Sequence, residues 1–137
     1  MAEQQEDGAR RPGDAPDPAG EPLMAPFRVI RGDRDGAAVL RVEGDVDLTT
    51  VPGLTAAIAE VVVVRPWVFV LDLTRVTFLA SVGLSALVIA QRDTADQTEL
   101  RVVATGRGAL RPIQLTGLDG VLRLYSTLGA ALEGSLG

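Results

Sequence analysis

Apolar and polar residues alternate in two short runs after residue 26, and each run predicts a β-strand. The runs extend from Phe27 to Arg31 and from Ala37 to Gly44. Between them lies Asp33-Arg34-Asp35-Gly36, whose Asp-Gly pair favours the tight turn of a hairpin. This part of the chain therefore predicts two strands joined by one turn.

Farther along, apolar residues recur every three or four positions, which predicts a helix with one apolar face. Thr49 or Thr50 can cap this helix, and Pro52 suits its first turn. Arg65-Pro66 ends it, because a residue before proline is disfavoured in helical conformation. The apolar positions of this helix are Val51, Leu54, Ile58 and Val61.

Two later apolar runs predict further strands. Trp67 to Leu73 is short, nearly continuous and rich in β-forming residues, as expected of a strand that is buried on both faces. Leu100 to Thr105 is the next strand. Between them we expect a loop from Thr74 to Phe78 and a second helix from Val82 to about Arg92.

The remaining residues complete an alternation of strands and helices. A third helix is expected to be broken by Pro112 and stopped by Gly117. Val121 to Tyr125 predicts a short final strand, and Ser126 caps a last helix. Strands that alternate with helices in this way require crossover connections and indicate an α/β fold. The prediction is a single domain with a mixed sheet of about five strands and about four helices.

The second predicted helix begins on a serine, and its first turn is unusual. Ser81 is favoured as an N-cap because its oxygen can accept a hydrogen bond from a backbone N–H. Gly83 places a poor helix former in the first turn and leaves the helix start bare. A phosphate on this hydroxyl would be stabilised by the helix macrodipole and the free amides. The apolar residues of the helix cover too much of its circumference for a half-buried helix, which indicates contact with a partner. They are Val82, Leu84, Leu87, Val88 and Ile89.

The composition excludes several classes of chemistry. The 137 residues include no cysteine and no histidine, so thiolate and imidazole metal sites and histidine-activated nucleophiles are excluded. Asp45 and Asp47 could share a metal ion or act as acid and base, or they are solvated residues at a strand end. Thr105 to Gly108 has two glycines but no phosphate-binding lysine. We expect no enzyme activity, no metal site and no cofactor.

Residues 1–26 differ in composition from the rest of the chain. They contain five of the eight prolines, and six acidic residues against two arginines give them a net charge of −4. Such a segment cannot bury enough apolar surface to become ordered, so we expect a disordered, acidic, proline-rich tail. The remainder is close to neutral and offers no basic surface for nucleic acid. Neither a membrane-spanning run nor a signal peptide is expected, which predicts a cytoplasmic protein.

Three segments of the chain form a recognisable set. They are LRVEGDVDLTT, VFVLDLTRVTFLASVGLSAL and LTGLDGVLRLY, in this order. The middle segment is the most specific, with an apolar strand, Asp72-Leu73, a stretch to Phe78 and then Ser-x-Gly-Leu. Together they resemble the STAS domain of bacterial anti-sigma factor antagonists. The resemblance covers residues 27–134, which we expect to form the domain.

The resemblance implies a regulatory binding protein. Members of this family bind an anti-sigma factor, which is a histidine-kinase-like ATPase, and thereby free a sigma factor. The same kinase phosphorylates a serine at the start of the second helix, here Ser81, and the complex separates until a PP2C-type phosphatase resets it. The partner-facing surface would combine the loop before the first helix, the start of the second helix and the loop around Gly106 to Gly108. The residues implied at this surface are Asp45, Asp47, Thr49, Ala80, Ser81, Val82, Gly83, Leu84, Gly106 and Arg107.

The chain departs from the family pattern on both sides of Ser81. Ala80 stands where the family commonly has aspartate, and Val82 stands where it has serine or threonine. Two hypotheses follow: an antagonist switched by phosphorylation, or a STAS-type scaffold that binds a regulatory partner without being phosphorylated. A third is a nucleotide- or lipid-binding module, as in STAS domains fused to transporters, but the sequence shows no transmembrane segment in its support.

Overall fold

The computed structural model describes residues 26–133. Apart from Pro26, the predicted tail lies outside the described residues, as does Gly134 at the end of the predicted domain. Five strands form one sheet in the order β1-β2-β3-β4-β5. β1 runs antiparallel to β2, and the other neighbours are parallel. The strands are β1 (Arg28–Arg31), β2 (Ala38–Val46), β3 (Val68–Leu79), β4 (Glu99–Val103) and β5 (Leu124–Tyr125).

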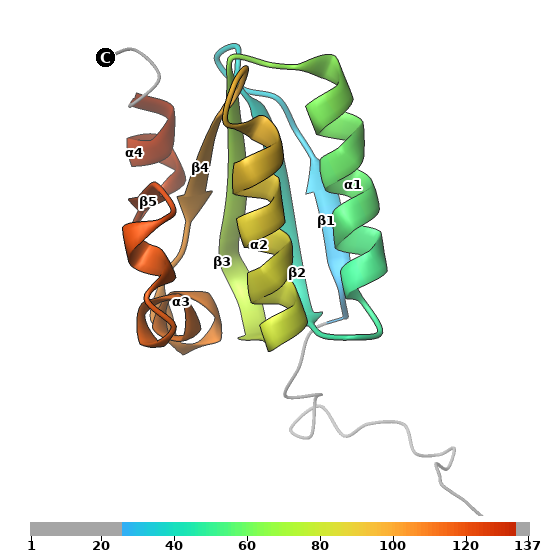
Figure 1. Cartoon of the computed structure of the whole chain (residues 1–137), viewed down its shortest axis with the longest axis vertical. Coiled ribbons are helices and arrows are strands. Elements are labelled where there is room, and N and C mark those ends of the chain that lie inside the picture. The colour runs from blue at the N-terminus through green and yellow to red at the C-terminus, as the bar shows by residue number, and fades with distance from the viewer. Residues whose placement is uncertain (1–25, 134–137) are drawn as a thin grey trace, which may run out of the picture.

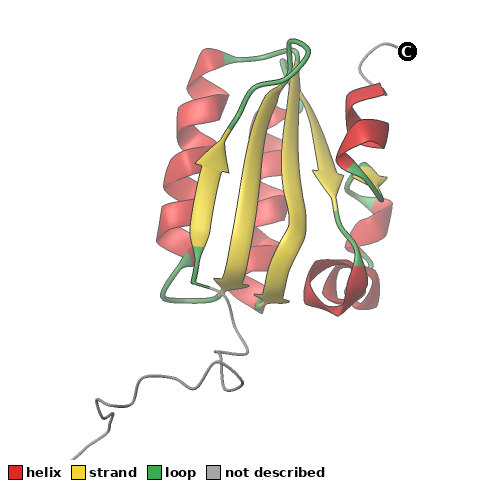
Figure 2. Ribbon diagram, turned by 180° about the vertical axis from the view of Figure 1, so that it is seen from behind, coloured by secondary structure: helices red, strands yellow, loops and turns green. Residues whose placement is uncertain are grey.

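Helices cover the two faces of the sheet unequally. α1 (Val51–Val64) and α2 (Ser81–Thr94) pack side by side on one face (Figure 1). The short α4 (Leu128–Glu133) packs on the other face, and Figure 2 shows no described helix over β1 and β2 on that side. No helix within residues 26–133 is long and apolar enough to cross a membrane. The remaining helical segments are the π-helical turn η3 (Gly106–Leu110), α3 (Arg111–Leu115) and the 3₁₀ turn η4 (Leu118–Gly120).

The main core lies between the sheet and the pair α1 and α2. The buried residues of α1 are Leu54, Ile58 and Val61, which are three of its predicted apolar positions. They pack with β3, whose Phe69 and Leu71 are fully buried. From Val68 to Leu73 the central apolar run is a buried strand, as predicted, but Trp67 lies before the strand and is exposed. The fold class of five strands and four α-helices is confirmed.

The predicted hairpin between β1 and β2 is also confirmed. Arg34 and Ala37 exchange backbone hydrogen bonds of 3.0 and 2.8 Å. Asp35 and Gly36 between them have φ angles of 52° and 83°. Two consecutive left-handed residues are typical of the tight hairpin turn that Asp-Gly favours.

β3 is longer than predicted. Thr74 to Phe78, expected to be a loop, continues the strand to Leu79. Arg75 lies opposite Glu43 at the end of β2, and the pairing continues to Leu79, with one register shift just before Glu43 and another just after Gly44. The side chains of residues 74–78 are mostly exposed and polar, so the sequence pattern resembles a loop although the backbone is paired to a distant strand.

Two helix starts differ from the prediction. α2 begins at Ser81 with Ala80 as its N-cap. α4 is preceded by Thr127, whose Oγ1 accepts a hydrogen bond from the N–H of Ala130 at 3.0 Å. Thr127 therefore takes the capping role that was predicted for Ser126.

Candidate functional site

The carboxyl ends of β2 and β3 lie next to each other at one end of the sheet, the lower end in Figure 1. Parallel pairing places Asp45 opposite Phe78 at this end. The loop from β2 to α1, the start of α2 and the turn η3 all meet here (Figure 1). Open α/β sheets commonly bind their ligands outside the carboxyl ends of their strands. We define the serine face as residues 45–49, 77–78, 80–84 and 106–108.

The loop after β2 is held in shape by its own hydrogen bonds. Asp47 Oδ1 accepts hydrogen bonds from the N–H groups of Thr49 and Thr50, at 3.0 and 3.1 Å. The Thr50 hydroxyl donates to the carbonyl oxygen of Asp45 at 2.8 Å and accepts from the N–H of Asp47 at 2.9 Å. Thr50 is the N-cap residue of α1, one of the two predicted, but its hydroxyl is bonded within the loop and not to the first helical turn. The loop is therefore preorganised, with Thr49 exposed on it.

A hydrogen bond also joins this loop to the end of β3. Thr77 Oγ1 donates to Asp45 Oδ1 at 2.6 Å. Asp45 and Asp47 thus have separate partners, and no group of three or more acidic residues within residues 26–133 could hold a metal ion. The contacts of the two carboxylates fit the interpretation that they stabilise the loop.

Ser81 is the first residue of α2 and not its N-cap, so the predicted cap is wrong by one position. The preceding Ala80 has extended backbone, with φ −74° and ψ 169°. Its carbonyl oxygen accepts hydrogen bonds from the N–H groups of Gly83 and Leu84, at 2.9 and 3.1 Å. The Ser81 side chain is exposed, and its hydroxyl has no hydrogen-bond partner among the described residues. Because the first amides of a helix lack intrahelical partners, this free hydroxyl lies at the positive end of α2.

Two glycines allow the elements of the serine face to pack closely against each other. A Cβ on Gly83 would lie 2.6 Å from Leu79 Cδ1 and 2.8 Å from Val46 Cγ1. A Cβ on Gly108 would overlap the carbonyl oxygen of Val76. Gly83 therefore does not leave the helix start bare, as the sequence suggested, because it lets α2 pack closely on the ends of β2 and β3. Gly108 does the same for η3.

Apolar side chains are exposed on the serine face. Leu48 is 76% exposed and Phe78 is 52% exposed. Val82 is half-buried, and Arg107 is exposed at the start of η3. Leu48 and Phe78 are thus the large apolar side chains that the serine face exposes, and exposed apolar patches mark surfaces that bind other proteins.

A family model for the STAS domain matches residues 31–131. The chain belongs to the STAS domain family. It is 45% identical over 109 residues to the anti-sigma-F factor antagonist RsfB of Mycobacterium tuberculosis, covering 80% of this chain and 89% of that protein. The crystal structure of an anti-sigma factor antagonist from Mycobacterium paratuberculosis is 42% identical, with a TM-score of 0.78 over 82% of this chain and 97% of that one. The phosphorylated form of SpoIIAA from Bacillus is 16% identical, with a TM-score of 0.56 over 80% of this chain and 99% of that one, a likeness that concerns the fold alone.

The STAS domain gathers the residues that the sequence implied for the partner surface, but it does not expose all of them. Gly83 is buried and Leu84 is half-buried against the core, so their contribution is mainly packing. Gly106 has a φ of 70° and starts the turn that presents Arg107. The exposed Leu48 was missed, although an apolar residue inside the polar stretch Asp47 to Thr50 was a usable signal.

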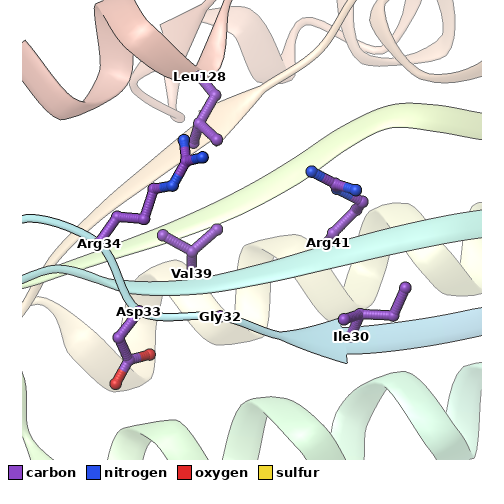
Figure 3. Close-up of a pocket in the computed structure, with 7 residues that line it drawn as sticks. All are labelled: Ile30, Gly32, Asp33, Arg34, Val39, Arg41 and Leu128. Atoms are coloured by element: carbon purple, nitrogen blue, oxygen red, sulfur yellow. The ribbon is translucent and has the colours of Figure 1, made fainter.

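A hollow of about 200 Å³ lies on the other face of the sheet, next to α4 (Figure 3). Arg34 and Arg41 rise from that face, while Asp33 points away from them (Figure 3). Asp33 is bonded instead to Arg31, which donates from Nε at 2.9 Å and from a terminal nitrogen at 3.2 Å. This hollow is separated from Ser81 by the sheet and forms no part of the serine face.

Proposed function

We propose that this STAS domain is an anti-sigma factor antagonist, that it binds an anti-sigma factor through the serine face, and that phosphorylation of Ser81 ends the binding. The observation that carries the proposal is the exposed, unbonded hydroxyl of Ser81 at the N-terminus of α2, on the same face as the exposed Leu48 and Phe78. Family membership and the two mycobacterial relatives support it. A protein that acts by binding needs no catalytic group of its own.

The position of Ser81 explains why a phosphate would leave the fold intact. A phosphoserine carries a charge of about −1.5 to −2 near neutral pH. At the first position of α2, the phosphate can accept hydrogen bonds from free amides, and the helix dipole favours its charge.

The same phosphate would oppose partner binding. An anti-sigma factor that covers Leu48 and Phe78 would also remove water from the phosphate. Burial of a charge without a compensating partner is strongly unfavourable. A single modification can therefore separate the complex while the domain remains folded.

The proposal includes the partners and the boundaries that the family resemblance implies. The anti-sigma factor would be a histidine-kinase-like ATPase that acts as the serine kinase, and a PP2C-type phosphatase would remove the phosphate. The domain would comprise residues 27–134. The protein would act in the cytoplasm, where a sigma factor is regulated.

The test compares Ser81→Ala, Ser81→Asp and the control Ser85→Ala. Ser85 is exposed on α2 one turn after Ser81, so Ser85→Ala removes a similar hydroxyl from the same helix. With kinase and ATP present, Ser81→Ala should stay bound to the anti-sigma factor, whereas wild type and Ser85→Ala should be phosphorylated and released. Ser81→Asp should bind weakly from the start. Because Ser81 is not the N-cap, Ser81→Ala loses no cap hydrogen bond, and its melting temperature should remain close to that of wild type.

Calorimetric affinities and mass spectrometry of the bound and released fractions distinguish the outcomes. Phosphorylated wild type that holds the anti-sigma factor with unchanged affinity would refute the switch at Ser81. Binding without any phosphate on Ser81 would support the alternative, a STAS-type scaffold, to which the departures at Ala80 and Val82 point. Absence of binding to any anti-sigma factor would refute the antagonist itself.

A further inference from the structure

Three large apolar side chains are exposed where the last residues of α1 lead into β3. This connection lies at the end of the sheet opposite the serine face, the upper end in Figure 1. Val63 is 78% exposed, Val64 is 63% exposed and Trp67 is 86% exposed. Three large exposed apolar residues within five positions of the chain favour an interaction surface, and tryptophan is among the residues enriched at the energetic centre of interfaces. We define the Trp67 surface as Val63, Val64, Arg65, Trp67 and Asp96.

Arg65 adopts an unusual backbone conformation for its residue type. It is the C-cap of α1, with φ 56° and ψ 57°, in the left-handed region where glycine is the usual residue. The guanidinium of Arg65 has no hydrogen bond or ion pair among the described residues. Arg65 therefore occupies a position that glycine would adopt at lower cost, and its guanidinium is available to a partner outside the domain.

An unpaired carboxylate lies on the same surface. Asp96 and Arg65 line one hollow of about 500 Å³ together with Val63. Asp96 also lines a second hollow together with Trp67. The carboxylate of Asp96, like the guanidinium of Arg65, has no ion-pair partner within residues 26–133. The Trp67 surface thus carries one unpaired positive charge and one unpaired negative charge.

An apolar groove adjoins this surface. It has a volume of about 290 Å³ and lies between α1 and α2. Val63 lines both the groove and the hollow of Arg65 and Asp96, so the two are adjacent. Ala59, Ala86 and Ala90 line it, and their small side chains leave room for a large one.

We propose that the Trp67 surface binds a second copy of this chain in a two-fold symmetric dimer. Each Trp67 enters the α1–α2 groove of the other copy, and each Arg65 pairs with Asp96 of the other copy. A surface with one unpaired charge of each sign and with both an apolar knob and an apolar groove is complementary to itself, as a two-fold interface requires. α1 has 14 residues and spans about 21 Å between the two ends. The dimer therefore leaves both serine faces free, and it is independent of the proposed function of Ser81.

Trp67 is the only tryptophan of the chain, so its fluorescence reports on this surface alone. Sedimentation equilibrium and tryptophan emission of the full chain should both change with concentration, with dimer formation accompanied by a blue shift. Trp67→Ser should raise the dissociation constant of the dimer at least tenfold. Leu115→Ser is the matched control, since Leu115 is 73% exposed but lies on α3, away from the Trp67 surface. It should leave the dissociation constant unchanged.

Charge reversal tests the pairing between copies. Arg65→Asp and Asp96→Arg should each weaken the dimer at least fivefold, and the double variant should recover most of the loss. Aspartate tolerates left-handed backbone, so Arg65→Asp should remain folded, which its melting temperature will show. A chain that stays monomeric with solvent-exposed emission up to its solubility limit would overturn the proposal. A blue shift that occurs only when an anti-sigma factor is added, or a double variant no better than the single ones, would also overturn it.

Discussion

Replacement of Gly83 by alanine tests whether close packing holds the start of α2 against the sheet. The added Cβ would lie 2.6 Å from Leu79 and 2.8 Å from Val46, whose side chains are 4% and 0% exposed. Glycine to alanine in a helix otherwise stabilises by about 0.8–1 kcal/mol. Overpacking of a buried site costs about 1–3 kcal/mol. We therefore expect Gly83→Ala to be destabilising by about 1 kcal/mol, with an upper bound of about 2 kcal/mol.

Thermal unfolding followed by circular dichroism measures this effect. For a domain of this size, 1 kcal/mol corresponds to a melting temperature lower by about 4–8 °C. Gly129→Ala is the control, because the nearest atom to its added Cβ, Thr127 Oγ1, is at 4.0 Å, an ordinary contact. Gly129→Ala should stabilise by up to about 1 kcal/mol, since only helix propensity changes. If Gly83→Ala melted at or above wild type, the packing account of this glycine would be refuted.

Two further predictions concern side-chain hydrogen bonds. Thr77→Val removes the hydrogen bond to Asp45, and we expect this to cost about 1 kcal/mol of stability, measured by thermal unfolding. We also expect weaker binding to the anti-sigma factor, measured by calorimetry. Unchanged affinity would show that this hydrogen bond does not shape the serine face. The hydrogen bond from Arg31 lowers the pKa of Asp33. The stability that this pair adds to the folded domain is therefore present above the usual pKa of aspartate and is lost as the pH falls through the lowered pKa. Because this pair is exposed, Asp33→Asn should change the free energy of unfolding by less than about 0.5 kcal/mol at neutral pH, and a larger loss in chemical denaturation would contradict this.

The elements that the sequence predicted well are those whose pattern is local. The period of Leu54, Ile58 and Val61 follows from the geometry of a single helix, and the Asp35-Gly36 turn follows from the backbone preferences of two residues. Neither needs information about distant parts of the chain. The hairpin and α1 were therefore predicted correctly.

Two of the predictions that failed depend on distant partners. Thr74 to Phe78 is a strand because β2 supplies its hydrogen bonds, and nothing in its own polar sequence shows this. Gly83 is explained by Val46, which is distant in the sequence and comes close only through the parallel pairing of β2 and β3. The sequence motif located the serine face around Ser81. The packing that shapes this face was visible only in the structure.

The connection between β3 and α2 consists of Ala80 alone. Its N–H donates to the carbonyl oxygen of Val46 at 2.9 Å, and its own carbonyl oxygen accepts the first hydrogen bonds of α2. Ser81 therefore follows the sheet with no flexible linker, and in the folded domain it cannot adopt the extended conformation of a flexible substrate peptide. An enzyme that modifies it must recognise the assembled surface, so a short peptide with this sequence should be a poor substrate. Modification would then be restricted to chains that have completed folding.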